Sequence, residues 1–405
     1  MRYRSDEEAV KWFEQAWSKS PCKKPIRTII KGFKSYELPK GASRVETDMF
    51  RDCKRMTKIT LPDTVKYINA RAFSGCKSLE ALDVPPAVKS IGDRAFLGCT
   101  SLSSVKIPPS VKEIGFDAFS GCTSLSSVEM SQVESIGVGT FSGCRSLASV
   151  SLPSTVKSIG RGAFSDCSSL TVLAIPPSVT SIGENAFNNC NALTSVSFSP
   201  SLKTMGGRAF YGCRSLPSVE LPPSLTALDA GTFQSCVSLT SVTIPPSVES
   251  IGENAFRECT SLRSIVLPSS VVSIGENAFR DCTALSSVSL SSSLENIGDK
   301  AFFGCKSLAS VEIPSSVKTI GNAAFSGCAA LTSISIPQSV ETIGDRAFSL
   351  CTSLESAVVP KSATIGKEVF PAKTKITYRG GSAPSGGSDE PSEKKGLKGL
   401  FGLKF

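Results

Sequence analysis

The chain has 405 residues, a formal net charge of +9, fifteen cysteines and no histidine. The lack of histidine excludes imidazole general bases, serine–histidine and cysteine–histidine nucleophile pairs, and most catalytic zinc sites. No apolar stretch approaches the ~18–20 residues of a membrane-spanning helix. Acids and tryptophans stand in the first thirty residues, where a secretory signal would be apolar. We therefore expect neither a signal peptide nor a transmembrane segment.

The N-terminal segment, residues 1–45, is basic, with 11 Lys or Arg against 5 Asp or Glu. It opens with Ser5-Asp6-Glu7-Glu8, the pattern of a capping box with acids in the first helical turn. Four apolar residues that follow share one helical face, namely Ala9, Phe13, Ala16 and Trp17. The segment is therefore predicted to be an N-terminal cap with an amphipathic helix; a partner-binding helix is the alternative.

A repeated unit of 23 residues occupies most of the remaining chain. Phenylalanines recur every 23 residues except at two steps of 22, and a cysteine follows three places after each of them up to Phe348. Fourteen of the fifteen cysteines therefore hold one position of the repeat. A unit this short cannot fold alone, so its apolar positions must be buried against neighbouring units. The phenylalanines are Phe50, Phe73, Phe96, Phe119, Phe141, Phe164, Phe187, Phe210, Phe233, Phe256, Phe279, Phe302, Phe325, Phe348 and Phe370.

Each unit predicts one short strand followed by a turn. In the third unit, Val105 and Ile107 follow the period of two that is typical of a strand, and Pro108 then ends the ladder. Ser104 and Lys106 are therefore predicted to point away from the core. Gly115 is interpreted as a turn residue with positive φ.

The pattern L-x-x-[VI]-x-[LI]-P followed by I-G-x-x-A-F-x-x-C resembles the BspA-like class of leucine-rich repeats, over residues ~38–370. The resemblance implies a right-handed arc whose parallel strands line the inner face, and a role in protein binding. The fold class is accordingly predicted as a leucine-rich-repeat solenoid of about 14 coils with a helical N-terminal cap. The expected domains are the cap (1–45), the solenoid (46–378) and a disordered linker and tail (379–405). Members of this class are often secreted adhesins, and the missing signal departs from that pattern.

The cysteines are interpreted as core residues rather than as reactive groups. They form a column with one thiol per coil, without a C-x-x-C spacing or a histidine co-ligand. A small, weakly polar side chain suits such a buried column, and reduced thiols favour a reducing compartment. We therefore expect no catalytic residue, no metal, no cofactor and no enzyme activity, and an intracellular, most simply cytoplasmic, protein.

The outward strand positions form the candidate protein-binding surface. The first outward position is serine in most units, and the second varies in charge. A mixed, hydroxyl-rich face without aromatic residues or a basic stripe is unsuited to nucleic acid. The alternative is that serine merely suits an exposed parallel sheet. The most charged part lies in the N-terminal third and comprises Lys58, Thr60, Asp83, Ser104, Lys106, Ser127 and Glu129.

The C-terminal tail is the second candidate. A Gly- and Ser-rich linker over residues 380–388 precedes a segment in which lysines alternate with large apolar residues. Three interpretations stay open: a solvated disordered tail, a docking motif for a protein, and an anchor on an anionic membrane, which is the only membrane contact we expect. The residues concerned are Lys394, Lys395, Leu397, Lys398, Leu400, Phe401, Leu403 and Phe405.

These features predict a non-enzymatic scaffold that binds an unidentified protein through its solenoid and, in one interpretation, its tail. The alternative function is a peripheral membrane or cell-surface adhesin-like protein that is held by the tail.

Overall fold

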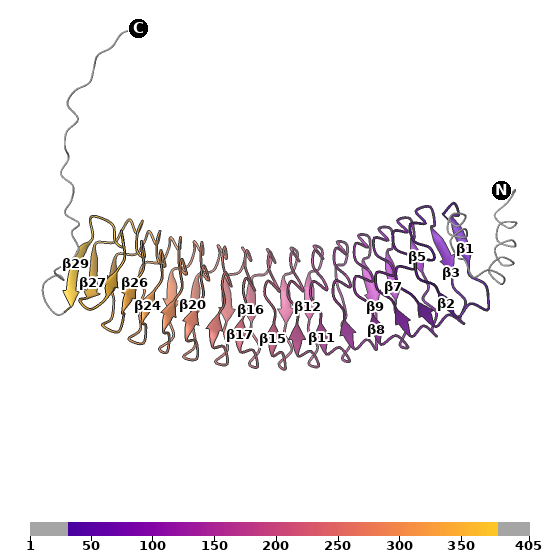
Figure 1. Cartoon of the computed structure of the whole chain (residues 1–405), viewed down its shortest axis with the longest axis horizontal. Helices are drawn as coiled ribbons and strands as arrows, with labels where there is room; N and C mark the ends of the chain where they lie inside the picture. Colours follow the sequence, from indigo (N-terminus) through magenta and orange to yellow (C-terminus); the bar gives the residue numbers. More distant parts are fainter. Residues whose placement is uncertain (1–30, 380–405) are drawn as a thin grey trace, which may run out of the picture.

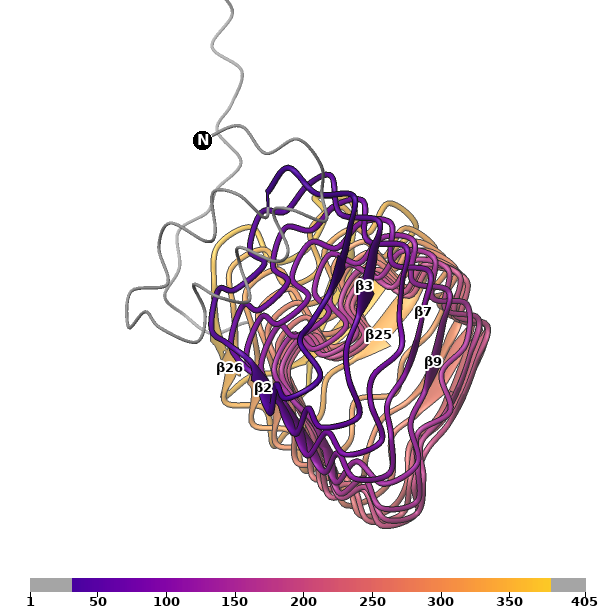
Figure 2. The same ribbon diagram turned by 90° about the vertical axis from the view of Figure 1, so that its right-hand side faces the viewer.

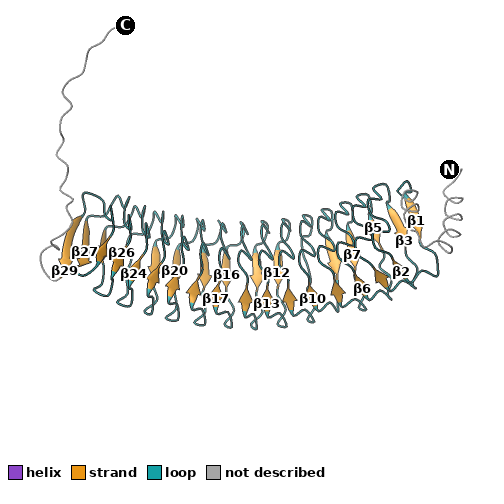
Figure 3. Cartoon of the chain, in the orientation of Figure 1, coloured by secondary structure: helices purple, strands orange, loops and turns teal. Residues whose placement is uncertain are grey.

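The structure, a computed structural model, describes residues 31–379. The chain winds into a solenoid of about 15 turns, and Figure 1 shows that the stacked coils form an arc whose two ends rise toward the same side. The leucine-rich-repeat solenoid predicted from the sequence is confirmed. No helix is present within residues 31–379, where strands alternate with turns and loops (Figure 3). The predicted helix of the cap and the C-terminal tail lie outside the described residues.

Most coils contribute a strand to a first parallel ladder; the coils of residues 149–151 and 310–312 do not. In most coils this strand spans three residues with the burial pattern exposed, buried, exposed, as predicted for Ser104 and Lys106 around Val105. The strands of the first ladder are β1 (Ser35–Glu37), β3 (Lys58–Thr60), β5 (Ala81–Leu82), β7 (Ser104–Lys106), β9 (Ser127–Glu129), β12 (Val172–Ala174), β14 (Ser195–Ser197), β16 (Ser218–Glu220), β18 (Ser241–Thr243), β20 (Ser264–Val266), β22 (Ser287–Ser289), β25 (Ser333–Ser335), β27 (Ser356–Pro360) and β29 (Lys375–Arg379).

A second parallel ladder of two-residue strands runs along the opposite side of the coil (Figure 2). The prediction of a single sheet on the inner face was therefore incomplete, because the returning segment of each repeat also pairs with its copy one repeat later. Its strands are β2 (Arg44–Val45), β4 (Tyr67–Ile68), β6 (Ser90–Ile91), β8 (Glu113–Ile114), β10 (Ser135–Ile136), β11 (Ser158–Ile159), β13 (Ser181–Ile182), β15 (Thr204–Met205), β17 (Ala227–Leu228), β19 (Ser250–Ile251), β21 (Ser273–Ile274), β23 (Asn296–Ile297), β24 (Thr319–Ile320), β26 (Thr342–Ile343) and β28 (Thr364–Ile365).

The solenoid begins earlier than the boundary predicted at residue 46. β1 pairs with β3 and β2 pairs with β4 in the same parallel register as in later coils. Residues 35–45 therefore supply both strands of a first coil, and about 15 coils replace the predicted 14. The segment Ser35-Tyr36-Glu37-Leu38-Pro39 fits the repeat, with tyrosine in place of the usual valine. At the other end, β29 pairs with β27 and is the last strand of the described residues.

The third side of each coil is the run of turns that leads from its second-ladder strand to the next first-ladder strand. A column of phenylalanine rings lies inside this side. Neighbouring rings from Phe50 to Phe370 are stacked, with centroids 5.0–5.7 Å apart. Such offset stacking adds to the burial of large apolar surface. Because each ring packs between two others, the core of one coil is completed only by its neighbours.

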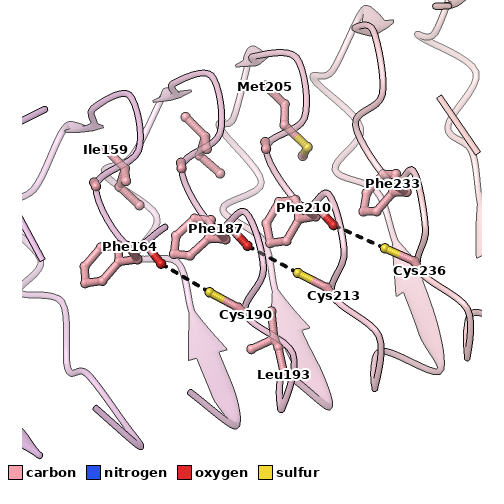
Figure 4. Close-up of a cluster of buried hydrophobic side chains, with 14 of the residues drawn as sticks. Ile159, Phe164, Phe187, Cys190, Leu193, Met205, Phe210, Cys213, Phe233 and Cys236 are labelled. Atoms are coloured by element: carbon pink, nitrogen blue, oxygen red, sulfur yellow. Dashed lines mark hydrogen bonds between the residues drawn. The ribbon is translucent and has the colours of Figure 1, made fainter. Parts of the chain in front are cut away.

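The cysteine column does more than fill space. From Cys76 to Cys351, each thiol donates a hydrogen bond to the phenylalanine carbonyl oxygen of the preceding coil, with Sγ–O distances of 2.9–3.4 Å. Figure 4 shows three of these bonds beside the stacked rings. The same oxygen also accepts the backbone N–H of its own coil's cysteine, as Phe50 does from Cys53. Cysteine thus satisfies the second lone pair of a buried carbonyl.

The repeated glycine has a different role from the one predicted. The φ of Gly115 is not positive; instead, a Cβ at this position would lie 2.4 Å from the backbone nitrogen of Asp93 in the preceding coil. Glycine is therefore needed for the close approach of two backbones. Left-handed φ values occur two residues before the phenylalanine, as at Arg94 with φ of 55°.

Burial of the thiols makes stability depend on alkaline pH. Desolvation raises the pKa of Cys99 and of Cys236 to about 12, so these thiols stay protonated in the folded protein above the pH at which an unfolded chain ionises them. A raised folded-state pKa stabilises the protein below the unfolded pKa of about 8.5, and this contribution is lost as the pH rises from there toward 12.

We expect the free energy of unfolding to fall between about pH 8.5 and pH 11, by as much as ~1.4 kcal/mol per pH unit for each thiol. Urea denaturation at each pH measures this change. The double variant Cys99→Ala and Cys236→Ala should be less stable at neutral pH but should have a shallower alkaline slope. Equal slopes for the two proteins would contradict the coupling of thiol ionisation to unfolding.

Candidate functional site

The predicted surface residues lie together on the first ladder. Ser104 pairs with Ser127 and Lys106 with Glu129 across β7 and β9. Lys58 pairs with Ala81 on β5, which in turn pairs with Ser104. The seven predicted residues are all exposed, and we call them, with Ser35 and Glu37, the β1–β9 face.

Ser35 and Glu37 belong to this face because they pair with Lys58 and Thr60. Ser35 and Glu37 were not predicted as surface residues, because residues 1–45 were assigned to the cap. The signal that could have found them is the leucine-proline pair at 38–39, which follows β1 as it follows other strands of the first ladder.

The second column of the face carries three carboxylates, one lysine and one neutral threonine. Lys106 and Glu129 form an ion pair with a Nζ–Oε2 distance of 3.5 Å, and their side chains are 81% and 72% exposed. An exposed pair of this kind contributes little to stability, and both groups remain accessible to a partner. Glu37 and Asp83 continue the column as anions on either side of Thr60.

The serine hydroxyls of the face differ from those just before the strands. Ser103 donates its hydroxyl to Glu80 O at 3.2 Å, and Ser126 donates to Ser103 O at 3.1 Å, so these side chains bind one coil to the next. Among the residues that the structure describes, the hydroxyls of Ser104 and Ser127 have no such partner. They are therefore free to bond with another molecule, and they are not needed for the sheet itself.

Two exposed valines on the same ladder were not singled out as binding residues from the sequence. Val172 is 52% exposed and Val266 is 66% exposed, at the first and second outward positions of β12 and β20. They interrupt the serine and mixed-charge columns, which is the signal that could have drawn attention to them. Val172 lies two coils beyond β9 and Val266 six, so neither belongs to the β1–β9 face.

The described part of the chain provides no site for catalytic chemistry that we can identify. Residues 31–379 hold no group of three or more Cys, Asp or Glu side chains able to bind a metal ion. Burial raises the pKa of the column thiols, which opposes formation of the nucleophilic thiolate. Residues 31–379 also include no helix with the length and hydropathy needed to cross a bilayer.

The chain belongs to the BspA-type leucine-rich-repeat family. The model of the BspA-type leucine-rich-repeat region matches residues 31–148, 134–263 and 249–377, so the match begins at the coil of β1 and β2. Proteins of this class are typically interaction scaffolds without enzyme activity.

A solved structure shares the fold. A leucine-rich-repeat protein from Bacteroides ovatus is 30% identical, with a TM-score of 0.69, over 86% of this chain and 84% of that one. A leucine-rich cell surface protein from Faecalibacterium prausnitzii is 26% identical, with a TM-score of 0.49, over 87% and 92% of the two chains. No functionally curated protein is significantly similar to the chain.

We predict that the exposed ion pair of Lys106 and Glu129 can be removed by substitution without loss of the fold. We expect Lys106→Ala and Glu129→Ala each to change the free energy of unfolding by less than about 0.5 kcal/mol, because both side chains are hydrated in either state. Urea denaturation followed by circular dichroism measures the change. Cys122→Ala, which alters the core of the coil between β7 and β9, is the destabilising control. A loss above 1 kcal/mol (roughly one core methylene) for either surface variant would contradict the assignment.

Proposed function

We propose that the protein is a non-enzymatic scaffold that binds a protein partner through the β1–β9 face. The observation that carries this proposal is the continuity of the sheet. β1, β3, β5, β7 and β9 form an unbroken five-stranded sheet, whereas the first ladder between β12 and β22 consists of two-stranded pieces. A hydrogen-bonded sheet holds its outward side chains in fixed positions, which reduces the entropy lost on binding.

The chemistry of the face indicates the kind of partner. Three carboxylates and two lysines beside unpaired serine hydroxyls favour a polar protein surface of complementary charge. The face has no basic stripe and no aromatic stacking platform, and we therefore propose no nucleic-acid partner.

We also propose an intracellular, reducing location, with the cytoplasm as the simplest case. The fourteen described cysteines are buried, and none of them is in a disulfide. Thirteen of them bond to a phenylalanine carbonyl, an arrangement that uses the thiol hydrogen and that a disulfide would abolish. This chemistry supports a compartment that keeps thiols reduced.

Charge reversal tests the proposed surface. We expect Lys106→Glu to lower the amount of protein partner retained by the full-length chain about tenfold, since a like charge across an interface costs more than 1 kcal/mol. The measurement is a quantitative pull-down against the wild type, followed by titration with the recovered partner. Glu312→Lys, an exposed change at the equivalent position of a distant coil, is the matched control. Equal retention by wild type and Lys106→Glu would refute the β1–β9 face.

The composition of the tail supports a second candidate function, attachment to an anionic membrane. Lys394, Lys395 and Lys398 alternate with Leu397 and Leu400 in the sequence, which combines electrostatic attraction with apolar insertion. For this candidate we expect co-sedimentation of the full chain with phosphatidylserine vesicles, and its loss after deletion of residues 389–405. Neutral phosphatidylcholine vesicles are the control. Equal recovery of the full-length and shortened chains would exclude the anchor and leave the scaffold proposal intact.

A further inference from the structure

The junction between the coil of β14 and β15 and the coil of β16 and β17 differs from every other junction in the described solenoid. β14 and β16 lie in different sheets of the first ladder, and β15 and β17 lie in different sheets of the second. Elsewhere within residues 31–379, an interruption of one ladder faces an intact pair or bridge in the other. At this junction alone, neither ladder is continuous.

The first ladder is interrupted at Pro217. In other coils the residue before the strand donates its N–H to the preceding coil, as Thr194 does to Thr171 O at 2.8 Å. Thr240 donates in the same way to Pro217 O at 2.8 Å. Proline has no N–H, so the equivalent bond to the coil of β14 cannot form.

The second ladder is interrupted at Asp229, which replaces the repeated glycine. A Cβ on Gly206, the preceding copy, would lie 2.5 Å from Glu184 N, which shows how closely the backbones approach at this position. The N–H of Gly206 donates to Ile182 O at 2.9 Å and that of Gly252 to Leu228 O at 2.8 Å, but within the described chain the N–H of Asp229 makes no such bond. The aspartate side chain therefore holds the two coils apart on this side.

Asn69 holds the same repeat position in the second coil and keeps the bond, with a distance of 2.9 Å to Val45 O. The preceding coil there is the first of the described solenoid. The coil before Asp229 is packed between two described coils. A side chain at this position thus opens the ladder in the middle of the array but not near its end.

The third side of the coil stays connected across the junction. Phe210 N donates to Thr232 O at 2.9 Å, and the Cys236 thiol donates to Phe210 O at 3.2 Å. The ring spacing from Phe210 to Phe233 is 5.7 Å, equal to that of the next pair, Phe233 and Phe256, and larger than the others in the column. A hollow of about 660 Å³ also opens over the turns at this junction. Its lining residues are Glu184, Gly206, Gly207, Arg208, Asp229, Ala230, Gly231, Gln234, Glu253 and Asn254.

We propose that the solenoid is jointed at this junction. Two arms, residues 31–205 and 218–379, bend about the phenylalanine and cysteine column while the two interrupted ladders open and close. A hinge needs retained contacts and freedom beside them. Besides the column, the Ser224 hydroxyl keeps its bonds to Pro200 O at 2.8 Å and Leu202 O at 2.7 Å, whereas the strands of both ladders are unpaired here. Because each coil contacts only its neighbours, loosening one junction changes the angle between the arms without disturbing either arm.

Spin-label distances test the joint in the full-length chain. Labels on Lys157 and Glu249 span the junction, and labels on Glu249 and Glu341 span four coils along the unbroken second ladder. All three residues are exposed at the same repeat position, and each pair is 92 residues apart. A ketone-bearing unnatural amino acid carries the label, so that the cysteines are not modified. We expect the distance distribution across the junction to be at least twice as broad as the control distribution.

The repaired variant Pro217→Thr with Asp229→Gly restores the residue types of neighbouring repeats. We expect it to narrow the junction distribution to the control width, and to slow amide hydrogen exchange of residues 226–229 at least tenfold. Asn69→Gly, the same kind of change where the bond is kept, should alter neither measurement. Equal widths for the two label pairs in the wild type, or no narrowing in the repaired variant, would overturn the proposal.

Discussion

The contact of each coil with an identical neighbour is the constraint on which the rest of the structure depends. A single coil has one central ring and two strands of two or three residues, too little apolar surface to offset the loss of chain entropy. Its phenylalanine is buried only between two others, and its carbonyl oxygen is satisfied by a thiol that the next coil supplies. The core is therefore a property of the stack, and each coil must place its phenylalanine and its cysteine so that ring and thiol meet their partners.

A shortened repeat shows where this constraint is strict and where it is relaxed. The step from Phe119 to Phe141 has 22 residues, yet the rings remain stacked at 5.5 Å and the Cys144 thiol still reaches Phe119 O at 3.3 Å. The lost residue is absorbed near Met130, in a turn that lacks the usual proline, and the second ladder is interrupted between β8 and β10. Ring and thiol positions are thus held, and the turns and ladder edges accept variation.

The sequence predicts the repeat, the position of the first-ladder strands and the two outward columns, because these follow from periodicity alone. It does not predict the second ladder, since two-residue strands such as β8 are too short for a recognisable alternation. The prediction of a positive φ at Gly115 was also wrong. A glycine that is needed for the approach of a neighbouring backbone looks the same in a sequence as one that is needed for positive φ. The thiol bond is equally hidden, since cysteine as donor and cysteine as apolar filler occupy the same place in a repeat pattern.

Pro217 and Asp229 illustrate a limit of consensus reasoning in repeat proteins. Each is one substitution in a unit that keeps its phenylalanine, cysteine and leucine, so the unit still fits the repeat. The consequence appears only between units, where one residue removes a donor and the other adds a Cβ on the opposite side. Either change alone would leave one ladder intact, as at β8 and β10, and the remaining ladder would hold the coils parallel. Because both occur in the same coil, the uniform stack is divided into two arms, and the β1–β9 face lies wholly on the first of them.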